Sequence, residues 1–321
     1  MAPANKSLFI FSSNMKKFII KSSFFAILLV TPLLFFYLQN APFIAAYQIT
    51  NSYSFNEKLK WLTPPKKMEI IAIGSSMSLN NLSSSSIISG FKTEKYINLS
   101  SWGLKIKDLE LLAPLFAKLY NPTIVICASN IMDFKHPAIQ YDIKEIENHI
   151  LDGGNVYTQL FKKYYYNHTN KNKLNYLNNN IYTSLRFDNY GGVPFDKLNF
   201  KVEKFRWGLT HSIEQVDEQN YDALMRLSKF LKKQNILFLV AQTPIRTHLQ
   251  THKYKTDINT HIQRVRKIVE QNGGIVVNLA NIDLPDQYFA DSTHLNDVGA
   301  TYFTNLLITK YKERFKSSGS L

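Results

Sequence analysis

The chain has 321 residues, 45% of them hydrophobic, enough for one large domain with its own core and an insertion. Its formal net charge is +14, but no nucleic-acid motif or arginine-rich arm accompanies the scattered lysines, so we do not expect a nucleic-acid partner. The charge indicates either a solvated face or attraction to an anionic membrane surface or glycan. Cys127 is the only cysteine, which excludes an intrachain disulfide and a cysteine-based metal site.

The N-terminal segment combines lysines with a long apolar run. Lys16 and Lys17 precede the run 18–38, which as a helix spans roughly 30 Å, the thickness of a hydrocarbon core. Because basic residues stay on the cytoplasmic side, we expect residues 1–17 in the cytoplasm, a single-pass transmembrane anchor at 18–38, and a periplasmic or extracellular remainder. A cleaved signal peptide and a buried core helix are the alternatives.

The rest of the chain alternates between strand and helix patterns. Residues 39–67 have the character of a linker that ends near Pro64-Pro65, so the domain is expected at 68–321. Short apolar runs typical of buried strands lie at 69–73, 96–99, 123–128, 236–241 and 275–278. Helical patterns follow at 105–119, 217–233, 257–271 and 297–315. This alternation predicts an α/β fold with three layers, α/β/α, around a mainly parallel sheet of about five strands.

Residues 134–216 break this rhythm. The stretch is rich in Asn, Tyr and Lys and has no clear strand or helix period. We interpret it as an insertion beside the active edge of the sheet, either a substrate-binding lid or an ordinary surface elaboration.

Polar residues suited to nucleophilic catalysis follow the first and the last predicted strand. Gly74-Ser75-Ser76 comes directly after the first strand, at the sheet edge where open α/β sheets bind ligands. Asp291 and His294 share a loop, with a spacing that lets the carboxylate accept from one ring nitrogen while the other faces a serine. The structural alternatives are a serine-rich helix cap and a turn aspartate beside a surface histidine.

Four short blocks in this order resemble the SGNH/GDSL hydrolase superfamily. They are Gly74-Ser75-Ser76, the stretch Asn98–Gly103, Ala128-Ser129-Asn130, and the stretch Asp291–Leu295. The resemblance covers residues 68–134 and about 236–315, and leaves the insertion uncovered. Two residues depart from the family pattern: Ser75 stands where many members have Asp, and Ile131 replaces the Asp that usually follows the Asn of the third block.

The resemblance implies a role for each matched residue. Ser76 would be the nucleophile, His294 the general base and then the general acid, and Asp291 the residue that orients His294. The Ser76 amide, the Gly103 amide and the Asn130 side chain would form an oxyanion hole. The structural alternatives are a loop glycine at Gly103 and a strand-end turn residue at Asn130.

The Gly-Ser-Ser variant is similar to membrane-anchored branches of that superfamily, the alginate-type O-acetyltransferases and the D-alanyl-transfer proteins of teichoic acid. This similarity implies extracytoplasmic, serine-dependent acyl transfer to a cell-surface glycan or polymer through an acyl-enzyme. Its partners would be an acyl donor, a polymer acceptor and a multi-pass membrane acyl-transfer protein. The alternatives are a carbohydrate or lipid acyl esterase with the same triad, and a non-catalytic anchored protein that binds or assembles glycans.

Other polar residues are weaker candidates. Arg246 ends the fourth strand and could bind a substrate phosphate or carboxylate, although an ion pair is the stronger interpretation. Asp133 lies close to Asn130 and is a reserve carboxylate whose simpler role is structural. Because the histidines lack metal spacing and no glycine-rich phosphate loop follows the first strand, we expect neither a metal nor a cofactor.

Overall fold

The computed structural model describes residues 13–40, 50–62, 65–135, 139, 141–152, 185–195 and 216–317. The chain divides into two compact units, Met1–Gln48 and Ile49–Leu321. The described part of the first unit is one helix, α1 (Ser13–Asn40), with Pro32 inside it. In contrast to the transmembrane anchor expected at 18–38, no helix in the described ranges is both long enough and apolar enough to cross a membrane.

The second unit is built on a five-stranded parallel sheet in the order β2-β1-β3-β4-β5. The strands are β1 (Ile70–Ala72), β2 (Tyr96–Asn98), β3 (Ile124–Ser129), β4 (Leu237–Gln242) and β5 (Ile275–Asn278). Each matches a predicted run to within about one residue at either end, as expected for boundaries set by hydrogen bonding. The strands that follow β1 in the chain lie on both sides of it, β2 on one side and β3 on the other, so the strand order switches between β1 and β3. In such flavodoxin-like sheets, ligands bind beyond the carboxyl ends of the strands at this switch point.

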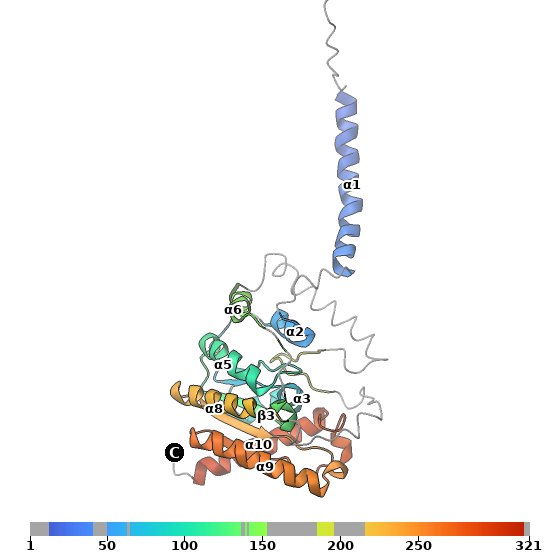
Figure 1. Cartoon of the computed structure of the whole chain (residues 1–321). Helices are drawn as coiled ribbons and strands as arrows, with labels where there is room; N and C mark the ends of the chain where they lie inside the picture. The colour runs from blue at the N-terminus through green and yellow to red at the C-terminus, as the bar shows by residue number, and fades with distance from the viewer. Residues whose placement is uncertain are drawn as a thin grey trace, which may run out of the picture. The chain divides into compact units, whose positions relative to one another are not determined.

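Helices cover both faces of the sheet, which confirms the predicted three layers (Figure 1). One face carries α5 (Ile106–Tyr120), α8 (Glu218–Lys233) and α9 (His252–Gln271), and the other carries α4 (Ser84–Phe91) and α10 (Asp297–Ser317). Successive strand side chains point to opposite faces. In β3, Val125 therefore packs with the first group of helices and Ile126 with the second.

Helix starts follow local capping. Asp217 caps α8 by accepting from the Gln219 amide at 3.0 Å, as its position in the sequence suggests. The helix predicted from residue 257 begins earlier, at His252, because the Thr251 hydroxyl accepts from the Tyr254 amide at 3.2 Å.

The predicted linker contains an ordered helix, α2 (Tyr53–Trp61). Phe55, Leu59 and Leu62 are buried in the same core as α5, so the compact unit begins before the expected boundary at residue 68. Of the predicted insertion at 134–216, the structure describes residues 134–135, 139, 141–152 with α6 (Ile143–Asp152), residue 216, and residues 185–195, which we call the strap. Residues 136–138, 140, 153–184 and 196–215 of the predicted insertion lie outside the described residues.

Candidate active site

The predicted nucleophile lies on a turn between β1 and a short helix, α3 (Ser76–Asn81). Ser75 is the N-cap of this helix, and its hydroxyl accepts from the Met77 amide at 3.1 Å. Ser76 is the first helical residue and stays partly exposed, whereas Met77 to Asn81 are all buried. The turn therefore presents one accessible hydroxyl at the carboxyl end of β1.

Ser78 fixes this turn to the sheet, a role that sequence reasoning missed. Its hydroxyl lies within hydrogen-bonding distance of the Ile73 and Ala128 carbonyls, at 3.1 and 2.9 Å, and accepts from the Ala128 amide at 2.8 Å. Gly74 makes room for it, because a Cβ there would lie 2.2 Å from the Ser78 oxygen and the Gly74 φ is +156°. The ends of β1, β3 and α3 are thus joined by one buried hydroxyl.

The second predicted segment is a tight loop organised by one carboxylate. Asp291 Oδ1 accepts from the amides of Thr293 and His294, at 2.8 and 2.7 Å, and Asp291 Oδ2 lies 2.7 Å from Nδ1 of the His294 ring. The Ala290 amide closes the loop by donating to the His294 carbonyl at 2.7 Å. The predicted pairing of Asp291 with His294 is therefore present. Because a carboxylate only accepts, Nδ1 carries the proton and Nε2 is the basic nitrogen of the neutral ring.

Asn81 joins the two segments. Its Oδ1 accepts from the Leu295 amide at 2.8 Å, and its Nδ2 donates to the Thr293 carbonyl at 3.3 Å. The last residue of α3 thereby holds both neighbours of His294 in the chain. The predicted approach of the Ser76 helix and the histidine loop is thus seen in the structure, while the hydrogen bond between Ser76 Oγ and His294 Nε2 stays a prediction.

The buried His261 shows the environment of a structural imidazole in this fold. His261 is 0% exposed, and its Nδ1 lies 2.8 Å from the Tyr221 hydroxyl. Burial lowers the pKa of His261 to about 3, so its ring stays neutral in the core. His294, with 15% of its side chain exposed and a carboxylate partner, has the environment that a catalytic base needs.

Gly103 lies on a turn beside the nucleophile segment. The Ser101 amide donates to the Gly74 carbonyl at 3.0 Å, and the turn closes from the Leu104 amide to the Ser101 carbonyl at 3.5 Å. The φ of Gly103 is +82°, a value that glycine adopts without strain, and the residue is exposed. The turn is therefore anchored to the Ser76 segment, and the oxyanion role of the Gly103 amide stays a prediction.

Asn130 ends β3 next to the same helix. Its Oδ1 caps a short 3-10 turn, η2 (Ile131–Phe134), by accepting from the Met132 amide at 2.9 Å. Its Nδ2 lies 3.1 Å from the Met77 sulfur, a weak acceptor. Asn130 therefore caps a turn at the end of β3 and also contacts α3 through Met77. Its donation to a substrate oxygen stays a prediction.

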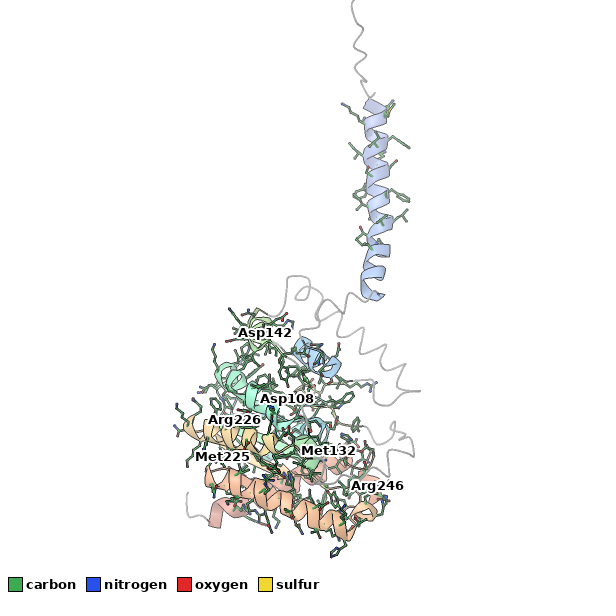
Figure 2. All side chains as sticks on the ribbon, viewed as in Figure 1. Asp108, Met132, Asp142, Met225, Arg226 and Arg246 are labelled. Carbon is green, nitrogen blue, oxygen red and sulfur yellow. The ribbon has the colours of Figure 1, made fainter. Side chains whose placement is uncertain are left out.

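Arg246 has a partner other than a substrate. It follows β4, and its guanidinium binds Asp286 through two contacts, Nε to Oδ1 at 3.0 Å and Nη2 to Oδ2 at 2.5 Å. The side chain is 4% exposed, and the Arg246 amide donates to the Ser292 carbonyl at 3.1 Å. Figure 2 shows Arg246 and Met132 toward the same end of the domain. This geometry favours a structural role for Arg246, as an ion pair that supports the histidine loop, rather than the binding of a substrate phosphate or carboxylate.

The strap packs against α3 and His294, a contact that the sequence did not reveal. The Val193 amide donates to the Leu79 carbonyl at 2.9 Å, and Asn80 Nδ2 donates to the Val193 carbonyl at 2.8 Å, so the strap lies along α3. At its end, the Phe195 ring meets the His294 ring edge to face, with centroids 5.9 Å apart. An aromatic side chain therefore shields one side of the imidazole from water.

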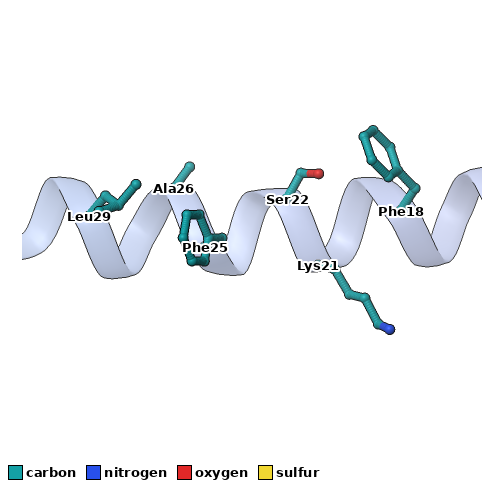
Figure 3. Close-up of a pocket in the computed structure, with 6 residues that line it drawn as sticks. All are labelled: Phe18, Lys21, Ser22, Phe25, Ala26 and Leu29. Carbon is teal, nitrogen blue, oxygen red and sulfur yellow. The ribbon is translucent and has the colours of Figure 1, made fainter.

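The first compact unit has a shallow groove on α1 (Figure 3). It is lined by Phe18, Lys21, Ser22, Phe25, Ala26 and Leu29. All six side chains come from successive turns of one helix, so the groove is the space between neighbouring side chains of α1 and contains none of the predicted catalytic residues.

Comparison with known proteins finds no matching protein family and no matching curated protein. Among solved structures, the chain is similar to the acetyl xylan esterase AlAXEase, with 16% identity over 76% of this chain and 99% of that chain and a TM-score of 0.41. It is also similar to a GDSL-like lipase from Bacteroides thetaiotaomicron, with 12% identity, coverages of 81% and 96%, and a TM-score of 0.40.

A family 3 carbohydrate esterase from Clostridium thermocellum is a further similar structure, with 12% identity, coverages of 76% and 94%, and a TM-score of 0.37. Similarities this distant carry no argument about the reaction, which depends on the residues described above.

Proposed function

We propose that the chain is a serine-dependent enzyme that acts on acyl esters through an acyl-enzyme at Ser76. The observation that carries the proposal is the pair of Asn81 hydrogen bonds, which hold the Asp291–His294 loop against the helix that begins at Ser76. A hydroxyl, a base and an orienting carboxylate then occupy one edge of the sheet, as nucleophilic catalysis requires.

Acylation would begin with His294 acting as base. Ser76 Oγ attacks the acyl carbon of the donor ester while its proton passes to His294 Nε2. Asp291 keeps Nδ1 protonated and stabilises the imidazolium that forms. The imidazolium then gives its proton to the departing alcohol oxygen, the bond from the acyl carbon to that oxygen breaks, and the acyl group stays on Ser76.

Deacylation would repeat these steps with a new nucleophile. The acceptor hydroxyl gives its proton to His294 and attacks the Ser76 ester, and the proton returns to Ser76 Oγ as that ester breaks. The acceptor in this proposal is a hydroxyl of a cell-surface glycan or polymer, with water as the alternative that would make the protein an esterase. The strap and Phe195 support transfer, because a shielded imidazole limits competition by water. The predicted membrane partner and extracytoplasmic location remain part of this proposal.

The first experiment replaces Ser76 by Ala and measures hydrolysis of p-nitrophenyl acetate and of an acetylated xylo-oligosaccharide. We expect S76A to lose at least about 10³-fold in kcat. The wild-type protein should also accumulate an acetyl group on the peptide that contains Ser76, detectable by mass spectrometry. Ser85, an exposed serine in the same serine-rich region, gives the matched control S85A, which should keep its activity. Equal turnover by S76A and the wild type would rule out Ser76 as nucleophile.

The second experiment separates transfer from hydrolysis. Wild-type protein is given the same acetyl donor with and without an unacetylated oligosaccharide, and acetylated sugar and free acetate are quantified. Transfer predicts that the sugar product rises at the expense of acetate, whereas an esterase releases acetate in both mixtures. If the acetyl donor is consumed in neither mixture but the oligosaccharide binds, the protein is instead a non-catalytic glycan-binding protein.

A further inference from the structure

Trp102 is a partly exposed aromatic residue at the edge of the candidate site. It precedes Gly103 on the turn that follows β2, and the Ser101 amide of this turn donates to the Gly74 carbonyl at 3.0 Å. Its indole packs against a small apolar cluster formed by Leu79 of α3 with two strap residues, Leu185 and Val193. Part of a large aromatic ring therefore stays in contact with water beside the turn that carries the predicted nucleophile.

Two elements fix Trp102 in place. Its indole Nε1 donates to Asn80 Oδ1 at 3.0 Å, and Asn80, which is 0% exposed, donates through Nδ2 to the Val193 carbonyl at 2.8 Å. The Trp102 carbonyl accepts from the Ser54 hydroxyl of α2 at 3.0 Å. The ring is thus held by α3 and the backbone by α2. A side chain held in this way loses little conformational freedom when a ligand binds to it.

The indole lies close to Ser76 and next to open space. Asn80 follows Ser76 by four residues in α3, so the partner of the indole nitrogen is about one helical turn, roughly 6 Å, from the nucleophile. Apart from the two chain neighbours of Gly103, no atom of the described residues lies within 4 Å of the position that a Cβ there would take. A ligand on the Trp102 side of Ser76 therefore has room at this turn.

The chemistry of the exposed indole surface narrows the class of ligand. Its only N–H already donates to Asn80, so the ring offers mainly apolar surface and a negative π face. A pyranose ring has C–H groups on its faces and hydroxyls around its edge. It can place the C–H groups on an indole while its hydroxyls stay in water. An acyl chain gains most from full enclosure, which a partly exposed ring on an open turn does not offer.

We propose that Trp102 is a sugar-binding residue of this site, on which a pyranose ring of the glycan stacks beside Ser76. The inference rests on the proposed function and deepens it, because it specifies a carbohydrate as the group recognised next to the acyl ester. The indole would hold the sugar so that one of its oxygens, acylated or free, lies near Ser76 Oγ.

The first test measures binding in the absence of turnover. Full-length S76A is mixed with xylohexaose or cellohexaose, and the sugar C–H signals are followed by proton NMR. Protons that lie over an indole face shift upfield because of its ring current, so we expect an upfield shift of ring C–H signals that saturates with protein concentration. If neither oligosaccharide shows this shift, Trp102 is not a platform for a pyranose ring.

Two variants at position 102 separate stacking from support of the fold. In the S76A background, W102F and W102L both lose the N–H that donates to Asn80, but only W102F keeps a flat ring. By calorimetry we expect W102F to bind the oligosaccharide within about 3-fold of S76A, and W102L to bind about 10-fold more weakly and to lose the upfield shift. Equal affinities of W102F and W102L would overturn the stacking role. The upfield shift needs no substitution at 102, so it decides the proposal even if W102L fails to fold.

Trp61 provides the matched control. It is also partly buried, and its ring lies 5.5 Å from the Phe187 ring of the strap, but it packs against the core that contains α5. W61L should leave the affinity for the oligosaccharide unchanged. An equal loss in W61L and W102L would show a general effect of removing a tryptophan and would contradict the proposed site.

Kinetics with Ser76 present connects the site to the reaction. On acetylated xylo-oligosaccharide, W102L should raise KM about 10-fold with kcat nearly unchanged, because a contact with the sugar is made before and during the reaction. On ethyl acetate, which has no sugar, its KM should equal that of the wild type. Turnover with equal KM values on the sugar ester would refute the role of Trp102 while keeping the proposed function. Stacking in S76A without any turnover by the wild type would keep Trp102 as a sugar site and refute the proposed function.

Discussion

The two segments that meet at the site are held in opposite ways. The loop at 290–295 is organised from within, because the Asp291 carboxylate binds two amides and a ring that all lie within the next three residues. The turn at 74–78 is organised from outside, because the Ser78 hydroxyl bonds to Ala128, 50 positions away. The orientation of His294 therefore depends on its own loop, whereas the presentation of Ser76 depends on how several strands and helices come together.

This difference decides which substitutions should harm chemistry and which should harm folding. A change at Asp291 alters one loop and the ring that it holds. A change at Gly74 or Ser78 alters the junction of β1, β3 and α3, so it should affect the stability of the whole unit.

The largest effect is expected from D291N. The amide oxygen can still accept from the Thr293 and His294 amides, so the loop should keep its shape, but the amide no longer stabilises an imidazolium or fixes the ring tautomer. We expect kcat on the acetyl ester to fall by about 10³- to 10⁴-fold, with a melting temperature close to that of the wild type. A large loss of melting temperature would show that this loop is not self-contained.

G74A should act mainly on stability. The added Cβ would lie 2.2 Å from the Ser78 oxygen, at a φ of +156°, and we expect the free energy of unfolding in urea to fall by about 2 to 4 kcal/mol. S78A alone leaves the Ala128 amide without its acceptor and should cost about 1 to 3 kcal/mol. The double variant should lose less than the sum, because it lacks the closest clash. Additive losses would show that Gly74 and Ser78 do not constrain each other.

N81A breaks the connection between the two segments and should have a smaller effect on stability than G74A and a smaller effect on catalysis than D291N. It removes the bonds to Thr293 and Leu295, at a cost of about 1 to 3 kcal/mol, and should lower kcat/KM by about 10- to 100-fold because the histidine loop shifts relative to Ser76. Asn56 is the matched control: it is buried and bonds to the Thr50 amide and carbonyl in the same way. An equal loss of activity in N56A would argue against a specific role for Asn81.

The same contrast explains what could be predicted from the sequence. The strands were visible because a strand buried on both faces is a continuous apolar run, and Asp291 with His294 was visible because the pair is local. The role of Asn81 could not be recognised in the sequence, because its partner Leu295 lies 214 positions away. The role of Ser78 could not be recognised either, because its neighbourhood is full of serines and only the fold tells them apart.

Helix α2 was missed although its signal was present. Phe55, Leu59 and Leu62 have helical spacing and all become buried, but the prolines at 64 and 65 favoured a linker interpretation for the whole stretch. The strap could not be predicted, because its contacts with α3 and His294 are made by backbone groups, a few apolar side chains and one aromatic ring that have no distinctive pattern in the sequence.

The lysine beneath the strap has a consequence for how the protein forms. Lys58 Nζ donates to the Asn98 carbonyl at 2.9 Å and to the Gly191 carbonyl, 133 positions away, and it lies 4.3 Å from the centre of the Phe187 ring. During synthesis, the Lys58 amine is exposed to water and has its ordinary affinity for a proton until Gly191 has been synthesised and folded against it. Burial lowers the pKa of Lys58 well below its usual range, although the Asp188 carboxylate partly opposes this. Packing the strap over the Lys58 amine therefore favours release of a proton, and this packing should be more stable in mildly alkaline than in acidic surroundings.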